Sequence, residues 1–387
     1  MSKFDTFQLF FTIFFPNLLF CFYNLQIICY NEKQYGAFFF EKSRDYPKKT
    51  RYKMKKKLFA ALALALSTVA LASCGASNQK LIFNANWQQQ TLKELSDATA
   101  EELTYEVKFD KATFMQREYF TVEYCGTNNS NPGTYTTKLE YLPESSTYRY
   151  SMELTIDVTF TLANGQSETQ TDTVSSVAIF KKADQSLSPI SSRKTVLCHS
   201  PNNVSAEKLE HTYTEYNYAF DIEYTYDGNT LTGGTVTKTD YIGTLLKTSP
   251  VTNDFGVDMK KYTYLDNEQL LFALRGVSAM SGEKTVNTYN ASLNAVEEMS
   301  ITPSSDVKTD FTFSLDGGEA STKEIKYIPV ALKSNNKNNQ LTQTLWYAKT
   351  LESNNNVYRN VLLKMSVPMH YGLGTLTYTL KDAKFSK

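Results

Sequence analysis

The sequence predicts a mainly β protein with long antiparallel, curved sheets and a few short covering helices, and it leaves an arrangement of two similar halves open. Three observations lead to this fold class. Apolar and polar residues alternate with period two over many stretches of the chain, turn dipeptides separate these stretches, and segments with helical periodicity are few.

The clearest strand covers residues 148–162, where every even position is apolar or aromatic and every odd position is polar. Asn164-Gly165 follows, and both residue types tolerate the positive φ angles of a tight hairpin turn. We therefore expect a return strand from Ser167 to Lys182. At about 3.3 Å per residue, the first strand would approach roughly 50 Å in length.

Further strands are expected wherever the same alternation recurs. An aromatic stripe on one face contains Tyr216, Tyr218, Phe220, Ile222, Tyr224 and Tyr226 and ends at Asp227-Gly228. The other expected strands are 103–109, 120–124, 260–265, 309–315, 323–333, 340–350, 357–367 and 375–380.

Three segments have helical character. They are Gln88 to Ala98, Asn267 to Arg275 with Asp266 as its N-cap and Gly276 as its stop, and Ala291 to Met299. We expect such helices to cover part of the apolar face of the sheet.

An export signal begins at Met54. Three lysines, Lys55 to Lys57, precede an uncharged run from Leu58 to Ala72, which is shorter than the ~20 residues that a membrane-spanning helix needs. The run ends in Leu71-Ala72-Ser73-Cys74.

This segment resembles the precursors of bacterial lipoproteins, whose lipobox is Leu, two small residues and Cys. The resemblance implies cleavage between Ser73 and Cys74, and a lipid, with palmitate among its acyl chains, on the Cys74 thiol. It also implies an extracytoplasmic protein that is anchored to the bacterial cell membrane without spanning it, because two acyl chains give a stable anchor. The alternative is a secreted protein with a chance cysteine near its cleavage site.

The signal sets the expected organisation of the chain. Residues 1–53 are expected to be an artefactual upstream extension or a hydrophobic segment, 54–73 the signal peptide and 74–80 a lipidated tether. A break at Ser200 to Asn203 then divides the body into β-rich halves, 81–200 and 201–387.

The charge of the mature chain argues against nucleic acid as a partner. Of the 40 basic and 40 acidic residues, 11 and 4 lie in residues 1–73, which leaves 29 and 36 and a formal charge of −7. An acidic chain repels the phosphate backbone.

The mature chain has two cysteines besides Cys74. Cys125 and Cys198 could form a disulfide outside the cytoplasm, or they could be two isolated thiols. Two cysteines alone lack the ligands for a metal site.

The last part of the chain resembles the closing strands of the lipoprotein-carrier family, in which a Trp-bearing strand, a turn and an apolar strand that ends near Pro complete a curved sheet. The matching residues are Trp346, Leu363, Met365 and Pro368. The resemblance implies an incomplete barrel that holds acyl chains, with Tyr216, Tyr218, Phe220, Tyr224 and Trp346 as candidate ligand-facing aromatics. The alternative is that these aromatics form the core of the sheet.

Catalytic motifs are absent from the sequence: it contains no G-x-S-x-G, H-E-x-x-H, P-loop or G-x-G-x-x-G. Cys198 and His199 are adjacent, but neighbours on a strand point to opposite faces. We therefore expect a non-enzymatic surface lipoprotein, without metal or cofactor, that binds or shelters an apolar ligand, such as a lipid, or a partner such as another surface protein. The alternative is a carbohydrate-binding or adhesive module, with a glycan as its ligand.

Overall fold

The structure is a computed structural model that describes residues 100–386 apart from several short gaps. The gaps are 112–119, 163, 184–185, 202–212, 229, 257–262, 265–270, 272–273, 275–281, 291–294, 336–340, 354–355 and 370–372. The export signal, Cys74 and the expected helix at Gln88 to Ala98 lie outside the described residues.

The described part of the chain is almost entirely β, which confirms the expected class. Eighteen of its strands form one sheet, and two form a separate hairpin. The first ten strands are β1 (Ala100–Lys111), β2 (Phe120–Tyr124), β3 (Gly133–Leu142), β4 (Thr147–Leu162), β5 (Ser167–Ala183), β6 (Ser186–Pro201), β7 (Tyr213–Asp227), β8 (Thr230–Ile242), β9 (Leu245–Leu246) and β10 (Val251–Gly256). The remaining strands are β11 (Thr263–Tyr264), β12 (Lys284–Asn290), β13 (Ala295–Pro303), β14 (Val307–Leu315), β15 (Ser321–Ser334), β16 (Thr342–Ala348), β17 (Leu351–Ser353), β18 (Asn356–Tyr358), β19 (Leu362–Pro368) and β20 (Gly374–Ser386).

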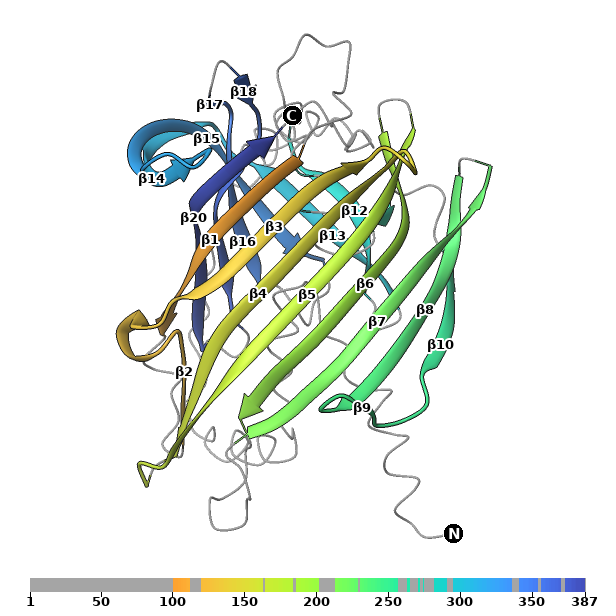
Figure 1. Cartoon of the computed structure of the whole chain (residues 1–387), viewed down its shortest axis with the longest axis vertical. Helices are drawn as coiled ribbons and strands as arrows, with labels where there is room; N and C mark the ends of the chain where they lie inside the picture. Colours follow the sequence, from red (N-terminus) through yellow and green to blue (C-terminus); the bar gives the residue numbers. More distant parts are fainter. Residues whose placement is uncertain are drawn as a thin grey trace, which may run out of the picture. The chain divides into compact units, whose positions relative to one another are not determined.

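The long strands form an antiparallel, curved array in the order β10, β8, β7, β6, β5, β4, β3, β1, β20 (Figure 1). β6 pairs with β7 from Ser191↔Glu223 to Pro201↔Tyr213. The strands on either side of the expected break near residue 200 therefore belong to one sheet.

Five strands at the end of the chain close into a small barrel. β14 pairs with β15, β15 with β16, β16 with β19 and β19 with β20, and β20 returns to β14. β20 also carries β1 along its other edge. It is therefore the strand that the barrel and the long array share.

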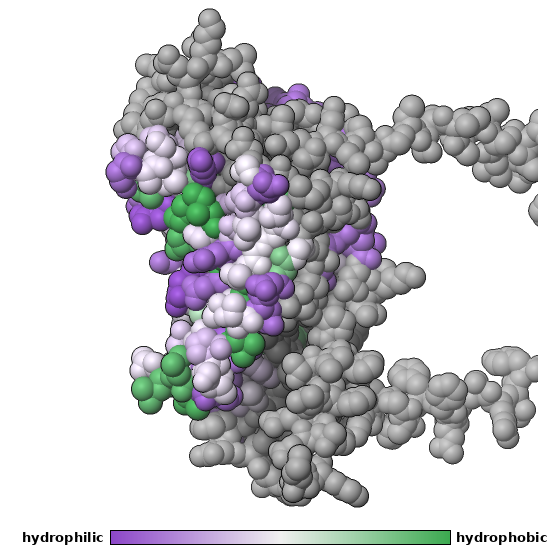
Figure 2. Space-filling model, turned by 90° about the vertical axis from the view of Figure 1, so that its right-hand side faces the viewer, coloured by the Kyte–Doolittle hydropathy of each residue, from purple (hydrophilic) through white to green (hydrophobic). Residues whose placement is uncertain are grey.

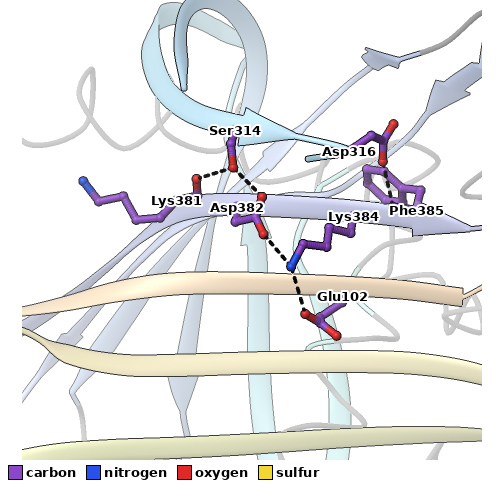
Figure 3. Close-up of polar contacts among 7 residues, drawn as sticks. All are labelled: Glu102, Ser314, Asp316, Lys381, Asp382, Lys384 and Phe385. Carbon is purple, nitrogen blue, oxygen red and sulfur yellow. Dashed lines mark hydrogen bonds and ion pairs between the residues drawn. The ribbon is translucent and has the colours of Figure 1, made fainter. Parts of the chain in front are cut away.

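The barrel closes through a short parallel contact between Ser314–Leu315 and Asp382–Ala383, and polar side chains reinforce it (Figure 3). Ser314 donates a hydrogen bond to Asp382, and Lys384 Nζ lies 3.0 Å from Asp382 Oδ2 and 3.5 Å from Glu102 Oε1 on β1. These contacts join three strands that are far apart in the sequence.

The turn after β14 also binds β20. The backbone N–H of Asp316 donates a hydrogen bond to the Ala383 carbonyl at 2.8 Å. The side-chain Oδ1 of Asp316 accepts a hydrogen bond from the Phe385 N–H at 2.8 Å. Asp316 has a φ of 52°, which aspartate tolerates better than most residues. Asp316-Gly317 is therefore a turn, as its sequence predicts.

The hairpin of β4 and β5 shows why these residues form strands. Inward-facing residues of β4 from Tyr148 to Phe160 are buried at every even position. On the outer face, hydroxyl groups pair across the strands, with Thr159 2.9 Å from Thr169 and Thr161 3.0 Å from Ser167. Gly165 occupies the turn with a φ of 83°, as the Asn-Gly dipeptide predicts.

The expectation of a few covering helices is wrong for the described residues. Among these residues, helical geometry is confined to the 3₁₀ turn Thr127–Asn129 and to the isolated residues Leu271 and Leu274, and residues 295–299 of the expected helix Ala291 to Met299 belong to β13. Glu297, Met299 and Ile301 are buried at alternate positions, and pairing with β12 and β15 outweighs a weak helical preference. Of Asn267 to Arg275, the structure describes only Leu271 and Leu274, both buried, and Leu271 has helical backbone geometry.

Candidate functional site

One face of the long array forms a continuous buried surface, which we call the inner face. The register places one inward residue from each of seven strands in a single row: Leu380, Tyr105, Tyr135, Leu154, Val174, Val196 and Tyr218. Each of them is at most 4% exposed. Apolar and aromatic side chains therefore extend across the sheet from β20 to β7.

Tyrosine rings pack against one another along this row. The Tyr135 ring lies 5.5 Å from both the Tyr105 and the Tyr378 ring, in tilted and edge-on arrangements. Tyr105 donates its hydroxyl proton to the Leu362 carbonyl at 2.8 Å, and Tyr347 donates to the Leu271 carbonyl at 3.0 Å. The rings present an apolar surface, and the hydroxyl groups of Tyr105 and Tyr347 are hydrogen-bonded to the backbone.

Some of the candidate ligand-facing aromatics lie on the inner face. Tyr218 and Phe220 are buried there, with ring centroids 5.3 Å apart, and Tyr216 and Tyr224 of the same strand are half-buried. Trp346 does not join them. Its neighbours Leu345 and Tyr347 are buried, whereas Trp346 is half-exposed and Lys364 Nζ lies 5.2 Å from its ring centroid.

Polar side chains interrupt the inner face on β5 and β6. Asp172 and Ser176 on β5, and Ser192 and Lys194 on β6, are all at most 9% exposed. Ser176 lies directly opposite Lys194, and this pair is in the row next to that of Val174 and Val196. On β5 and β6, the row that contains Val174 and Val196 is therefore flanked on the inner face by side chains that carry charges or hydroxyl groups.

Asp172 holds the end of β6 through one carboxylate oxygen. Its Oδ1 accepts the backbone N–H of His199 at 3.0 Å and lies 2.7 Å from His199 Nδ1. The other oxygen, Oδ2, is buried and has no hydrogen-bond partner, and the same is true of Ser176 Oγ. Burial raises the pKa of Asp172 to about 6, against the opposing effect of His199.

The surroundings of His199 do not form a catalytic triad. Its ring contacts Tyr213 edge-on at 4.9 Å, and its Nε2 lies 3.8 Å from Glu215 Oε2. Cys198, next to it on the strand, is buried, and burial raises the pKa of its thiol well above the usual range. A thiol in this environment stays protonated and is a poor nucleophile.

Cys125 and Cys198 are buried thiols and not halves of a disulfide. Cys125 donates a hydrogen bond through Sγ to the Val107 carbonyl at 3.2 Å, and burial raises its pKa to about 11. The sequence left a disulfide and two isolated thiols open, and in the structure the two cysteines are isolated thiols.

The described residues offer neither a metal site nor a membrane-spanning helix. They contain no group of three or more His, Cys, Asp or Glu side chains that could hold a metal ion. Within the same residues, no helix has both the length and the apolar character that crossing a membrane requires.

The sequence alone did not point to Asp172 or Ser176, and it drew attention to His199 only as the neighbour of Cys198. Asp172 has the same parity in β5 as Val174, Ala178 and Phe180, so strand periodicity could have placed it on the inner face. Its contact with His199, 27 residues away, depends on the pairing of β5 with β6 and has no local signal.

Comparison with known proteins yields weak structural likenesses only. The sequence matches no protein-family model and no curated protein. A β-barrel-like protein of a domain of unknown function, DUF1849, from Brucella abortus is similar with a TM-score of 0.42 and 9% identity, over 75% of this chain and 99% of the other. A protein from Parabacteroides distasonis described as a putative lipoprotein has a TM-score of 0.18 and 9% identity, over 74% and 95% of the respective chains. The fold therefore rests on the strand pairing described above.

Proposed function

We propose that this chain is a non-enzymatic bacterial lipoprotein that is held outside the cytoplasm by a lipid on Cys74 and binds an amphipathic ligand on its inner face. The anchor is supported by the lipobox and the signal before it. The ligand is supported by one observation in particular: an apolar, aromatic face that spans seven strands and carries buried polar atoms without partners.

The unpartnered atoms indicate what kind of ligand fits. Leaving a buried acceptor without a hydrogen bond costs roughly 1–3 kcal/mol, so folded proteins rarely do so. Asp172 Oδ2 and Ser176 Oγ lie beside an apolar row, on the same strand and the same face. A ligand with an apolar body and a hydroxyl, amide or amine group would satisfy the carboxylate while its body covers the row.

The distribution of aromatics favours this ligand over a glycan. Proteins that stack sugars on aromatic rings need those rings exposed, whereas Tyr218 and Phe220 are buried on the inner face. The outer face carries paired hydroxyls and ion pairs such as Arg193 with Asp221, 2.6 Å apart. Trp346 is half-exposed and partly covered by Lys364, and it is a single ring rather than a row.

Native mass spectrometry of the protein purified from its producing organism tests the ligand. We expect the spectrum to show, in addition to the mass of the anchored protein, the mass of a bound lipid-like ligand. This ligand should be lost in the Phe220→Ala variant and retained in the Trp346→Ala variant. Near-ultraviolet circular dichroism establishes that both variants fold. Asp172→Asn keeps the shape of the face, but it removes the charge and replaces one acceptor oxygen by an amide donor, so it should alter which ligand is retained.

Two results would contradict the proposal. A bare protein mass together with binding on a glycan array would replace the apolar ligand by a carbohydrate. For the anchor, Cys74→Ala should abolish labelling by radioactive palmitate, and label that persists in this variant would exclude Cys74 as the attachment site.

A further inference from the structure

The most exposed apolar residues of the described chain gather at the tip of one hairpin. Ile242 is 62% exposed, Leu245 73%, Leu246 61% and Val251 56%. Ile242 and Leu245 are cross-strand partners at the turn between β8 and β9, and Gly243 in that turn has a φ of 57°. We call residues 242–251 the apolar tip.

The tip lies at an edge of the long array. β10 pairs with β8 from Val251↔Lys238 to Gly256↔Gly233, and β9 pairs with the end of the same strand. Residues 247–250, which end in Pro250, interrupt the return strand between β9 and β10. Within them, Lys247 N donates to the Asp240 carbonyl at 2.9 Å. In Figure 2, hydrophobic residues project at the lower end of the described surface, the end at which Figure 1 places β9.

The composition of the tip fits a lipid surface better than a protein partner. Its four large apolar residues are all aliphatic, whereas the energetic centres of protein interfaces are enriched in Trp, Tyr and Arg. Exposed Lys247 follows Leu246 directly, where an ammonium group would lie at the level of the headgroups. The nearby charges are Lys238, paired with Asp240 at 3.0 Å, and exposed Asp254.

The proposed anchor would keep the tip within reach of a membrane. Residues 75–99 lie between Cys74 and the first strand, and at about 3.3 Å per residue they span at most roughly 80 Å. A lipid surface would therefore always be available to the tip at high effective concentration.

We propose that the apolar tip inserts into the outer surface of the membrane that carries the lipid anchor. Ile242, Leu245, Leu246 and Val251 enter the boundary between headgroups and acyl chains, and the tether supplies proximity. This inference rests on the proposed anchoring and is independent of the ligand on the inner face. It gives the sheet a second point of attachment and a fixed orientation to the bilayer.

Depth-sensitive fluorescence tests the insertion on the full-length gene product, purified from membranes and reconstituted in phosphatidylglycerol–phosphatidylethanolamine vesicles. An environment-sensitive dye is attached to Leu245→Cys, or to Val307→Cys as a control, because Val307 is 45% exposed on β14. We expect a blue shift and quenching by brominated lipid at position 245 and neither at position 307. Equal responses at the two positions would overturn the proposal.

Substitution supplies a second measurement. Leu245→Ser with Leu246→Ser should weaken partition into the same vesicles by about tenfold per leucine, whereas Val307→Ser should leave it unchanged. A dye at position 245 that is shielded but not quenched by brominated lipid would indicate contact with a second copy of the chain, and would also overturn the proposal. Ligand retention in native mass spectrometry should be the same in the tip variant as in the wild type, so failure of the tip and failure of the inner face are distinguishable.

Discussion

Asp172 binds His199 twice through the same carboxylate oxygen, once at the backbone N–H at 3.0 Å and once at ring Nδ1 at 2.7 Å. The second oxygen of Asp172 is left buried without a partner. One side chain therefore fixes the end of β6 and also keeps an acceptor on the inner face.

This relationship predicts an unusual pH dependence. Burial raises the pKa of Asp172 to about 6 from an ordinary value of 3.8, so the folded state binds a proton that the unfolded state has lost. The contribution of Asp172 to the free energy of unfolding is fully present below about pH 4, and it is lost as the pH rises through 6. The Asp172→Asn variant lacks this loss, so its free energy of unfolding should rise relative to that of the wild type by about 2–3 kcal/mol between pH 4 and pH 7. Urea denaturation of both proteins at several pH values measures the difference, and a constant difference would contradict the prediction.

The turn that closes the small barrel gives a second prediction. Asp316→Ala removes the acceptor for the Phe385 N–H and places alanine at a φ of 52°, so we expect a loss of about 2–3 kcal/mol in the free energy of unfolding. Asp316→Asn keeps an acceptor and tolerates this backbone, and it should cost less than about 1 kcal/mol. Denaturation curves measure both, and equal losses would show that neither the hydrogen bond nor the backbone conformation matters.

The two buried thiols should be inert in the folded protein. With a pKa of about 11, Cys125 is overwhelmingly protonated at pH 8, and burial raises the pKa of Cys198 as well. Iodoacetamide should leave both unmodified at pH 8 and modify both in urea, as peptide mass spectrometry can measure. Val307→Cys provides an exposed thiol as the positive control. Rapid native labelling of Cys125 or Cys198 would contradict the structure.

A glycine pair in β8 allows its neighbours to approach closely. A Cβ at Gly234 would lie 2.1 Å from the Glu223 carbonyl oxygen and 2.8 Å from the Phe255 ring. Gly234→Ala should therefore destabilise the protein by about 1–3 kcal/mol. Gly256→Ala in β10 meets nothing within 4 Å and should change stability by less than about 0.5 kcal/mol. Thermal unfolding of the two variants compares them directly, and similar midpoints would exclude the predicted clash.

Local patterns were enough to predict most strands. The alternation from Tyr148 and the Asn164-Gly165 turn predict β4, its hairpin and β5 nearly to the residue, because one face of each strand is buried and the other is solvated. The expected strand 357–367 is instead divided into β18 and β19, with Asn360 at a φ of 55° between them. A positive φ at asparagine is a local signal that the alternation alone does not show.

The pairing of distant strands could not be predicted. The closure of β14 on β20 involves two residue pairs and side chains from three strands, and no short stretch of sequence encodes it. The helix expected at Ala291 to Met299 was wrong for the same reason, because β13 gains its partners from β12 and β15. For the site, the alternation agrees with the burial of Tyr218 and Phe220 on one face, whereas Trp346 faces the other side of its strand, and the ligand-facing role of these residues stays a prediction.

β20, the last of the described strands, is also the partner of β1, the first of them, from Ala100↔Ser386 to Lys111↔Gly374. β1 therefore acquires this neighbour, and the small barrel closes, only after β20 has been synthesised. A sheet that depends on pairing between strands so far apart in the sequence folds slowly compared with one built from local contacts. Truncation within Gly374–Ser386 would therefore expose unpaired edges of β1, β14 and β19 at once.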